Sequence, residues 1–374
     1  MNREDFCKEI KKLMPSEYTS EVGFRNHLSS LLRNYEKLLK ELDEKDRLED
    51  WDEIIKQVCT VSGIIKEVVK RVYQGRHSYA FNLFKLIPEK IRIYKIIVDD
   101  SKWYRMRKME EKDNVKCKDL FHIPLDKRGI VKNQRYSASG YPCLYLGESI
   151  YTCWEEMNRP TLNRCFVSQF IAVKKSEKPL TLLFDMSCPS FEMWGQETIE
   201  ATNMWVSYNL KRLPLVIASM IRVNNPDDIF KPEYIIPQFV MEYILNQQYV
   251  KKKKDPDVKG VIFTSVHQND DFPFSYNDDN NDMPSYEYPH MQNLAIPIQN
   301  PLKGKFCTGL SDMFLMTAPT CYEFEQAKSS FSSSIAKSDN EKSGKYQYEV
   351  SIFGLLENRL SDKNRFPPEK FEDK

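Results

Sequence analysis

The sequence predicts an α+β protein, in which a small helical bundle precedes a sheet with flanking helices. Apolar residues recur at helical spacing in the N-terminal quarter, beginning with Leu28, Leu31, Leu32 and Tyr35. The polar segment 99–102 ends this pattern, and short apolar runs typical of strands follow it. We therefore expect a helical domain over residues 1–98, a sheet domain over 99–300 and a C-terminal extension over 301–374.

Two amphipathic helices account for most of residues 1–98. The first carries the leucine stripe that ends at Leu42, and the second follows Asp50 with a stripe of Ile and Val. Asp50 and Glu53 have the spacing of a capping box, and Gly75 is expected to end the second helix. We expect this bundle to act as an interaction or regulatory module.

Composition narrows the class of protein. The chain has 374 residues, a formal charge of +1, 41% hydrophobic and 29% charged residues, as in an ordinary soluble globular protein. It has no apolar run of about 18 residues that would span a membrane, and its start lacks the apolar core of a signal peptide. The nine cysteines form no C-x-x-C pair, which argues against a disulfide framework and a zinc site. We expect a cytoplasmic protein that needs no metal.

The sheet domain opens with an aromatic and basic strand. Trp103–Arg107 alternates so that Arg105 and Arg107 share one face. Further along, Leu144–Leu146 is a short apolar run between Pro142 and Gly147, typical of a buried strand. A helix is expected after Gly147, capped by Glu148 or Ser149 and reaching Met157.

The remaining elements are read in the same way. Strands are expected at 165–173, 180–184, 260–265 and 293–296, helices at 197–210 and from Pro237 onward, and a buried apolar run at 213–221. The tetralysine run 251–254, the acidic segment 270–283 and the Ser- and Lys-rich segment 329–345 are expected to be surface loops, and 365–370 a tail.

Several of these segments resemble one family. Residues 140–149 read G-x-P-x-L-Y-L-G-E-S, and with Thr152 and Glu156 they resemble the core motif of the RES domain, which is named for an Arg, a Glu and a Ser. The Trp103–Arg107 strand resembles the family's opening strand, and 233–238 resembles its E-Y-x-x-P-Q segment. Residues 260–265 resemble G-I-x-Y-x-S, with Phe263 in place of Tyr, and Asn293 begins a segment similar to the closing strand.

The resemblance implies a fold similar to ADP-ribosyltransferases and an enzyme that destroys NAD+, which is the substrate rather than a bound cofactor. In that case Glu156 stabilises the ribosyl cation and Tyr145 lines the nicotinamide pocket. Arg105, or Arg107 beside it, holds the pyrophosphate, and Ser265 hydrogen-bonds the Arg, the phosphate or the ribose. Arg135 is a second basic candidate for a phosphate or for Glu156, although a structural salt bridge would have the same sequence signature.

Alternatives of other classes stay open. The acceptor of the ADP-ribosyl group could be water, phosphate or a protein, so the enzyme is a glycohydrolase, a phosphorylase or an ADP-ribosyltransferase. A non-catalytic nucleotide-binding or interaction module is a second class. A third is a HEPN-type ribonuclease, which rests on the spacing of Arg71 and His77. The family resemblance further implies a toxin with an inhibitory antitoxin partner, and direct binding of nucleic acid is not expected.

Overall fold

The computed structural model describes residues 1–110, 115–173, 182–189, 191, 194, 199–247, 258–267, 291–299, 304–321 and 348–372. Contacts between Cα atoms divide the chain into two compact units. The helical unit comprises Met1–Lys95, Gln134–Tyr136 and Phe184–Lys253. The sheet unit comprises Ile96–Asn133, Ser137–Leu183 and Lys254–Lys374. Strands β1 (Tyr94–Ile96) and β5 (Leu182–Met186) lie where the chain passes between them.

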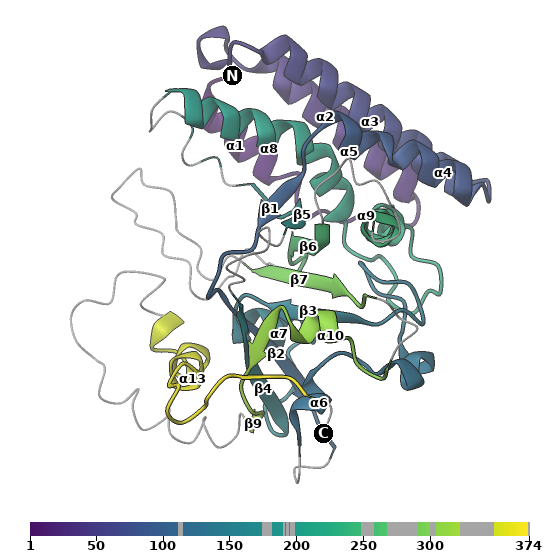
Figure 1. Ribbon diagram of the computed structural model, residues 1–374. Helices are drawn as coiled ribbons and strands as arrows, with labels where there is room; N and C mark the ends of the chain where they lie inside the picture. The colour runs from purple at the N-terminus through teal and green to yellow at the C-terminus, as the bar shows by residue number, and fades with distance from the viewer. Residues whose placement is uncertain are drawn as a thin grey trace. The chain divides into compact units, whose positions relative to one another are not determined.

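The helical unit contains the elements that the N-terminal periodicity predicts, together with two helices from the middle of the chain. Its helices are α1 (Arg3–Lys11), α2 (Phe24–Glu41), α3 (Trp51–Tyr73), α4 (His77–Phe84), α5 (Leu86–Lys90), α8 (Ile199–Ser219) and α9 (Ile235–Gln247), with 3-10 turns at η1 (Glu44–Asp46) and η3 (Pro232–Tyr234). Helices α2 and α3 lie side by side, and α8 packs against both (Figure 1).

Helix α8 departs from the expectation of a helix that stops at residue 210. It continues through Pro214 to Ser219, so the apolar run expected at 213–221 belongs largely to the same helix. The hydroxyl of Tyr35 in α2 donates to the carbonyl of Leu210 at 2.8 Å. Contacts of this kind group residues 184–253 with the N-terminal helices, whereas the sequence pattern assigned them to the 99–300 segment.

The ends of α3 test two local predictions. The helix ends at Tyr73, and Gly75 takes the left-handed conformation (φ +72°), as the sequence predicts. The predicted capping box is wrong, because Asp50 makes no side-chain hydrogen bond to the helix start. Its carboxylate instead accepts from Ser207 at 3.1 Å and Lys211 at 3.2 Å, both in α8.

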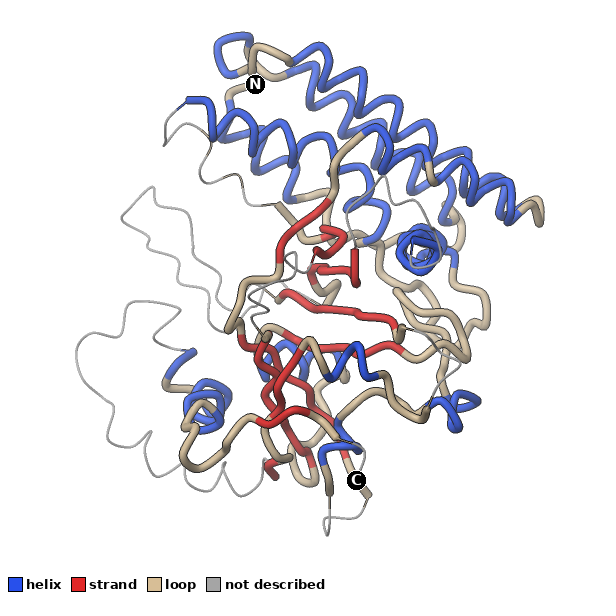
Figure 2. The backbone as a smooth tube through the Cα atoms, viewed as in Figure 1, coloured by secondary structure: helices blue, strands red, loops and turns tan. Residues whose placement is uncertain are grey.

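In the part of the sheet unit that the structure describes, the strand pairs are antiparallel. Figure 2 shows the strands in red. The strands follow the order β6-β7-β3-β2-β4-β8-β10, and β9 pairs with β4. Their bounds are β2 (Lys102–Lys108), β3 (Cys143–Gly147), β4 (Cys165–Ala172), β6 (Val258–Thr264), β7 (Gln292–Pro297), β8 (Phe314–Met316), β9 (Thr320–Cys321) and β10 (Glu369–Lys370). Its helices are α6 (Cys117–Leu120), α7 (Ile150–Glu156), α10 (Thr308–Ser311) and α13 (Ile352–Leu360), with a 3-10 turn η2 (Leu125–Ile130).

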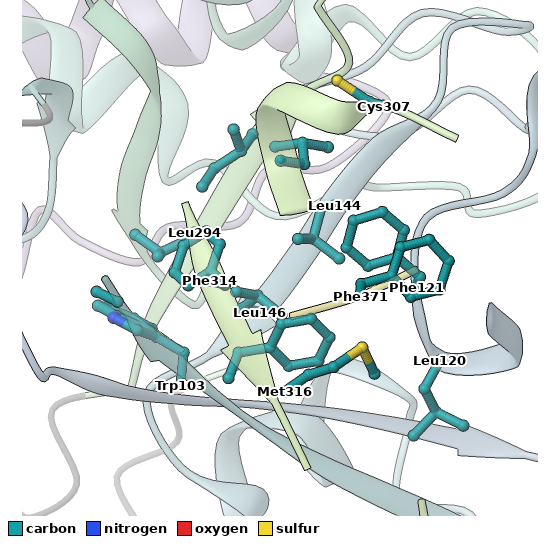
Figure 3. Close-up of a cluster of buried hydrophobic side chains, with 14 of the residues drawn as sticks. Trp103, Leu120, Phe121, Leu144, Leu146, Leu294, Cys307, Phe314, Met316 and Phe371 are labelled. Atoms are coloured by element: carbon teal, nitrogen blue, oxygen red, sulfur yellow. The ribbon is translucent and has the colours of Figure 1, made fainter. Parts of the chain in front are cut away.

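The two faces of this sheet bury different clusters. One cluster, drawn in Figure 3, contains Trp103, Leu144 and Leu294 from β2, β3 and β7. Tyr104 and Met106 alternate with Trp103 along β2, and they belong to a second cluster with side chains of α7 and α13. Since side chains alternate along a strand, these helices cover the face opposite to the cluster of Figure 3.

The C-terminal segment returns to the sheet instead of forming the expected tail. Strand β10 pairs with β8, with Glu369 opposite Met316. Phe371 is buried, and its ring stacks on Phe121 at a centroid distance of 4.1 Å. The loops expected at 251–254, 270–283 and 329–345 lie outside the described residues.

The predicted fold class is confirmed: the protein is α+β, with an N-terminal helical region and a sheet flanked by helices. Within the described parts of the chain, none of the helices has the length and apolar character required to cross a membrane.

Candidate functional site

Glu156 ends helix α7, which is held close to strand β3. Ser149 caps the helix, since its Oγ accepts from the Thr152 N–H at 2.9 Å, and this confirms one of the two predicted caps. Gly147 permits the close approach, because a Cβ built there would lie 2.8 Å from the Cys153 Sγ. Glu156 itself is exposed, and its Oε1 accepts from the Asn293 Nδ2 at 2.8 Å.

The sheet register brings the other motif segments to the same place. On β7, Asn293 lies opposite Gly147 of β3 on one side and Phe263 of β6 on the other. Ser265 follows β6, is fully buried, and donates its backbone N–H to the Met291 carbonyl at 2.8 Å. Its Oγ accepts from the His267 N–H at 3.1 Å. The segments that carry Glu156, Asn293 and Ser265 therefore meet at one end of β3, β7 and β6.

Asn293 is a site residue that sequence reasoning missed. The sequence marks it only as the first residue of a predicted strand, and the hydrogen bond to Glu156 joins positions 137 residues apart. Its place at the start of the family-like closing segment was the available signal.

Tyr145 lies in the middle of β3, opposite Ala295 of β7. The register places Tyr104 of β2 opposite Gly147, and Tyr145 is two residues from Gly147, so its side chain lies on the Tyr104 face of the sheet. Its hydroxyl hydrogen-bonds the Ser137 Oγ at 3.1 Å. Tyr145 is thus on the face that α7 covers.

Arg105 lies on β2 where this strand pairs with β3. The register of these strands consists of Tyr104 opposite Gly147, and the guanidinium of Arg105 reaches across to donate to the Tyr145 carbonyl at 2.7 Å. Its Nε is buried and finds no hydrogen-bond partner among the described residues. Burial, with a smaller effect of the Arg107 charge, lowers the pKa of Arg105 to about 9.

Arg107 lies two residues further along β2 and has a different environment. It donates to the Asp119 carbonyl at 2.5 Å, and burial lowers its pKa. It lines a surface hollow of about 250 Å³ whose wall carries more cations than anions. The other charged lining residues are Lys118, Lys127, Lys305, Asp119 and Asp126.

Arg135 belongs to the helical unit. Its guanidinium donates to the carbonyls of Ser219 at 2.7 Å and Ile221 at 3.1 Å, and it lies 5.3 Å from the centre of the Tyr234 ring. In the described residues it forms no ion pair with a carboxylate. These contacts favour a structural role for Arg135 over a role in binding phosphate.

The Arg71 and His77 pair of the ribonuclease alternative lies at the junction of α3 and α4. Arg71 pairs with Glu67, donates to the Gln74 side chain at 3.1 Å and lies 5.3 Å from the Tyr79 ring centre. His77 is exposed. The Nε of Arg71 is buried and has no partner among the described residues, and the other contacts of Arg71 are those of an ordinary helix end.

Among the described residues, no three His, Cys, Asp or Glu side chains lie close enough together to bind a metal ion. Glu156, Asn293 and Tyr145 belong to the face that α7 covers, whereas Arg105 and Arg107 alternate with Tyr104 along β2 and start on the opposite, Trp103 face. Arg105 is linked to the other residues through the Tyr145 carbonyl.

Comparison with known proteins adds one relative. No protein-family model and no solved structure matches the chain. Over 247 residues, 64% of its length, the chain is 33% identical to the protein named "Putative toxin YopC" of Bacillus subtilis (strain 168). The matched region covers 51% of that protein, so the chain spans about half the length of this curated relative.

Proposed function

We propose that this protein is a toxin-type enzyme that cleaves NAD+ at the bond between nicotinamide and ribose, with Glu156 as the catalytic carboxylate. The observation that carries the proposal is the hydrogen bond from Asn293 to Glu156, at the end of three paired strands that also bear Tyr145 and lead to Ser265. The similarity to a protein named a putative toxin supports the toxin part of the proposal.

The chemistry suits an exposed and oriented carboxylate. Breaking the N-glycosidic bond develops positive charge on the ribose, as in glycoside hydrolysis. Nicotinamide leaves as a neutral base, so the reaction needs no strong general acid. Asn293 holds one oxygen of Glu156, which leaves the carboxylate able to stabilise the ribosyl cation or to hold a ribose hydroxyl or the nucleophile.

The two arginines of β2 are the proposed binders of the pyrophosphate. A buried guanidinium nitrogen without a partner, as at Arg105, is costly unless a ligand or water satisfies it. Arg107 faces a hollow whose wall carries three lysines, which favours an anion. Both arginine side chains start on the face of β2 opposite to Tyr145. Arg105 is our first choice because its guanidinium reaches the Tyr145 carbonyl between β2 and β3, and Arg107 is the second.

The test is release of nicotinamide. The purified protein is incubated with NAD+, with and without inorganic phosphate, and nicotinamide is measured by chromatography. We expect Glu156→Ala to reduce the rate by about 100-fold or more, the size of effect seen when one charge-stabilising group is removed from an active site. Glu110→Ala is the matched control, because Glu110 is an exposed carboxylate of the same unit.

The products separate the alternatives. A phosphate-dependent rate indicates a phosphorylase, a phosphate-independent rate indicates a glycohydrolase, and labelled protein indicates an ADP-ribosyltransferase. Binding of NAD+ without release of nicotinamide would replace the enzyme by a nucleotide-binding module. If the protein neither binds nor cleaves NAD+, the proposal is wrong.

A toxin of this kind also requires restraint, so we propose an inhibitory protein partner, an antitoxin. Expression of the wild-type chain in a bacterial host should arrest growth and deplete NAD+, and Glu156→Ala should relieve both. A co-expressed antitoxin should restore growth and form a stable complex with the purified chain. Growth arrest with normal NAD+ would contradict this account of toxicity.

A further inference from the structure

Helix α13, in the C-terminal extension, packs against the helix that bears Glu156. We infer that α13 is a positioning element for the active site, in which Glu357 and Tyr348 fix helix α7 and so hold Glu156 beside Asn293. This inference rests on the proposed function, and it assigns Glu357 a role through α7 and not through contact with substrate.

Glu357 closes the start of α7 from a distant part of the chain. Its Oε1 accepts from the Ile150 N–H at 2.7 Å, across 207 residues of sequence. The same oxygen accepts from the Tyr348 hydroxyl at 2.5 Å. The first N–H groups of a helix lack partners within the helix, and Ser149 satisfies only that of Thr152. Glu357 therefore supplies a cap that the local sequence lacks.

Apolar contacts hold the same two helices together. The Phe353 ring packs against Tyr151 and Trp154 of α7, at centroid distances of 5.2 and 5.5 Å. Leu356 and Leu360 are buried in a cluster with Ile150 and Cys153. Because this contact lies along α7 as well as at its first residue, α13 restrains both the position and the direction of the helix.

The segment that presents Glu357 is itself fixed. Ser351 caps α13 by accepting from the Gly354 N–H at 3.3 Å, and its hydroxyl donates to the Tyr348 carbonyl at 2.6 Å. A Cβ built on Gly354 would lie 2.3 Å from that same carbonyl oxygen, so only glycine permits this approach. Tyr348 and Glu357 are thus held in one arrangement around the start of α7.

The consequence for catalysis follows from the length of α7. The helix runs only from Ile150 to Glu156, so a shift at its start carries over to the catalytic carboxylate. A misplacement of about 1 Å in an active site can cost about 100-fold in rate. Loosening α7 should therefore reduce turnover more than it reduces NAD+ binding, which we assign mainly to β2 and β3.

The test compares Glu357→Ala with Glu357→Gln in the full-length protein. Glu357→Ala removes the acceptor, and we expect kcat for nicotinamide release to fall by about 10-fold or more with KM for NAD+ changed less than about 3-fold. Glu357→Gln keeps an acceptor oxygen, and we expect it to retain most of the activity. Hydrogen exchange of the α7 amides, measured in parallel, should accelerate in Glu357→Ala and not in Glu357→Gln.

Phe314→Leu is the control for a merely structural effect, because Phe314 is buried in the cluster on the opposite face of the same sheet. An equal loss of kcat in Phe314→Leu at equal loss of stability would overturn the inference, as would wild-type kcat and wild-type α7 exchange in Glu357→Ala. If the wild-type protein releases no nicotinamide, the proposed function fails, and the α7 exchange still decides whether Glu357 fixes the helix.

Discussion

Each unit of the protein has an arginine with a buried guanidinium nitrogen, and the two arginines are satisfied to very different extents. In the helical unit, Arg212 donates to the Asn209 side chain through Nε at 3.0 Å and Nη2 at 2.7 Å, and to the Ser187 carbonyl at 2.6 Å. It also pairs with Asp185 at 3.6 Å. In the sheet unit, Arg105 donates to the Tyr145 carbonyl, and its buried Nε has no partner among the described residues.

This difference distinguishes a structural arginine from the arginine that we propose as a binder of the pyrophosphate. Burial alone would raise the pKa of Asp185, but the Arg212 charge and the Ser187 hydrogen bonds outweigh it and lower that pKa. The buried charge of Arg212 is therefore balanced by Asp185, and its hydrogen bonds are made within the core. Arg105 is desolvated without a carboxylate opposite, which lowers its pKa to about 9. A buried cation in that state costs stability, and an anionic substrate would offset the cost.

The largest expected effect is on Arg212. Arg212→Met leaves the buried Asp185 carboxylate without its counter-ion and the Ser187 carbonyl without its donor, and we expect a loss of about 3–5 kcal/mol in the free energy of unfolding. Denaturant unfolding, with hydrogen exchange to locate the loss in the helical unit, measures it. Lys211→Met is the control, because the Lys211–Asp50 pair is partly exposed and should contribute less than about 1 kcal/mol. Equal losses of unfolding free energy in the two variants would show that the buried Arg212 contributes no more to stability than the partly exposed Lys211.

The second effect distinguishes the two units by pH. His122 in the sheet unit is buried and neutral, since Nδ1 donates to the Ile123 carbonyl and Nε2 accepts from the Cys307 N–H. Burial lowers its pKa to about 4, with a smaller contribution from the Arg105 charge. The unfolded state therefore binds a proton at a higher pH than the folded state does. The His122 contribution to the stability of the sheet unit should fall, on the order of 3 kcal/mol, as pH falls from about 6.5 to about 4. Glu357 of the same unit acts in the opposite direction, because burial raises its pKa to about 7, so Glu357→Gln is the background in which the His122 contribution is measured.

In the helical unit, the Asp185 contribution should respond only at lower pH, whereas His27 in α2, whose pKa burial lowers, adds its own loss below its ordinary pKa. The lowered pKa of Asp185 gives stability that is present above the ordinary carboxyl pKa and is lost as pH falls through the folded-state value. Hydrogen exchange of the Glu357→Gln variant at pH 7 and pH 5, read separately for peptides of β2–β4 and of α3 and α8, measures the contrast. Equal acid sensitivity of both sets of peptides at pH 5 would contradict it.

The sequence could predict the parts of this comparison that depend on neighbours along the chain. The strand around Arg105, the strand of Tyr145 and the Ser149 cap each follow from residues within a few positions, and the structure contains all three. Local patterns also place strands before Ser265 and at Asn293.

The parts that sequence could not predict depend on contacts between distant residues. Periodicity identifies a helix near residue 200 but not its packing partners, so the grouping of α8 with α2 and α3 was missed. The same limit hides the bonds from Asn293 to Glu156 and from Ile150 to Glu357, because a side-chain hydrogen bond leaves no periodic signal. Arg135 shows the converse case: its position beside a motif suggested a site, and its contacts are with backbone carbonyls of the helical unit.

The smallest expected change in stability is at Arg105, and it is the most informative. Arg105→Met removes a poorly satisfied buried cation and keeps an unbranched apolar side chain, so we expect the free energy of unfolding to change by less than about 1 kcal/mol. It also removes a charge that lowers the pKa of His122. The folded-state pKa of His122 should therefore rise slightly, and the loss of stability that His122 causes at low pH should become smaller. If the proposed function is correct, nicotinamide release should nevertheless fall by about 100-fold, because the pyrophosphate loses its buried partner. Lys108→Met is the control for the loss of a positive charge, because Lys108 is an exposed cation at the end of the same strand.

A stability loss in Arg105→Met as large as that in Arg212→Met would show that both arginines are structural. It would also move the pyrophosphate assignment to Arg107.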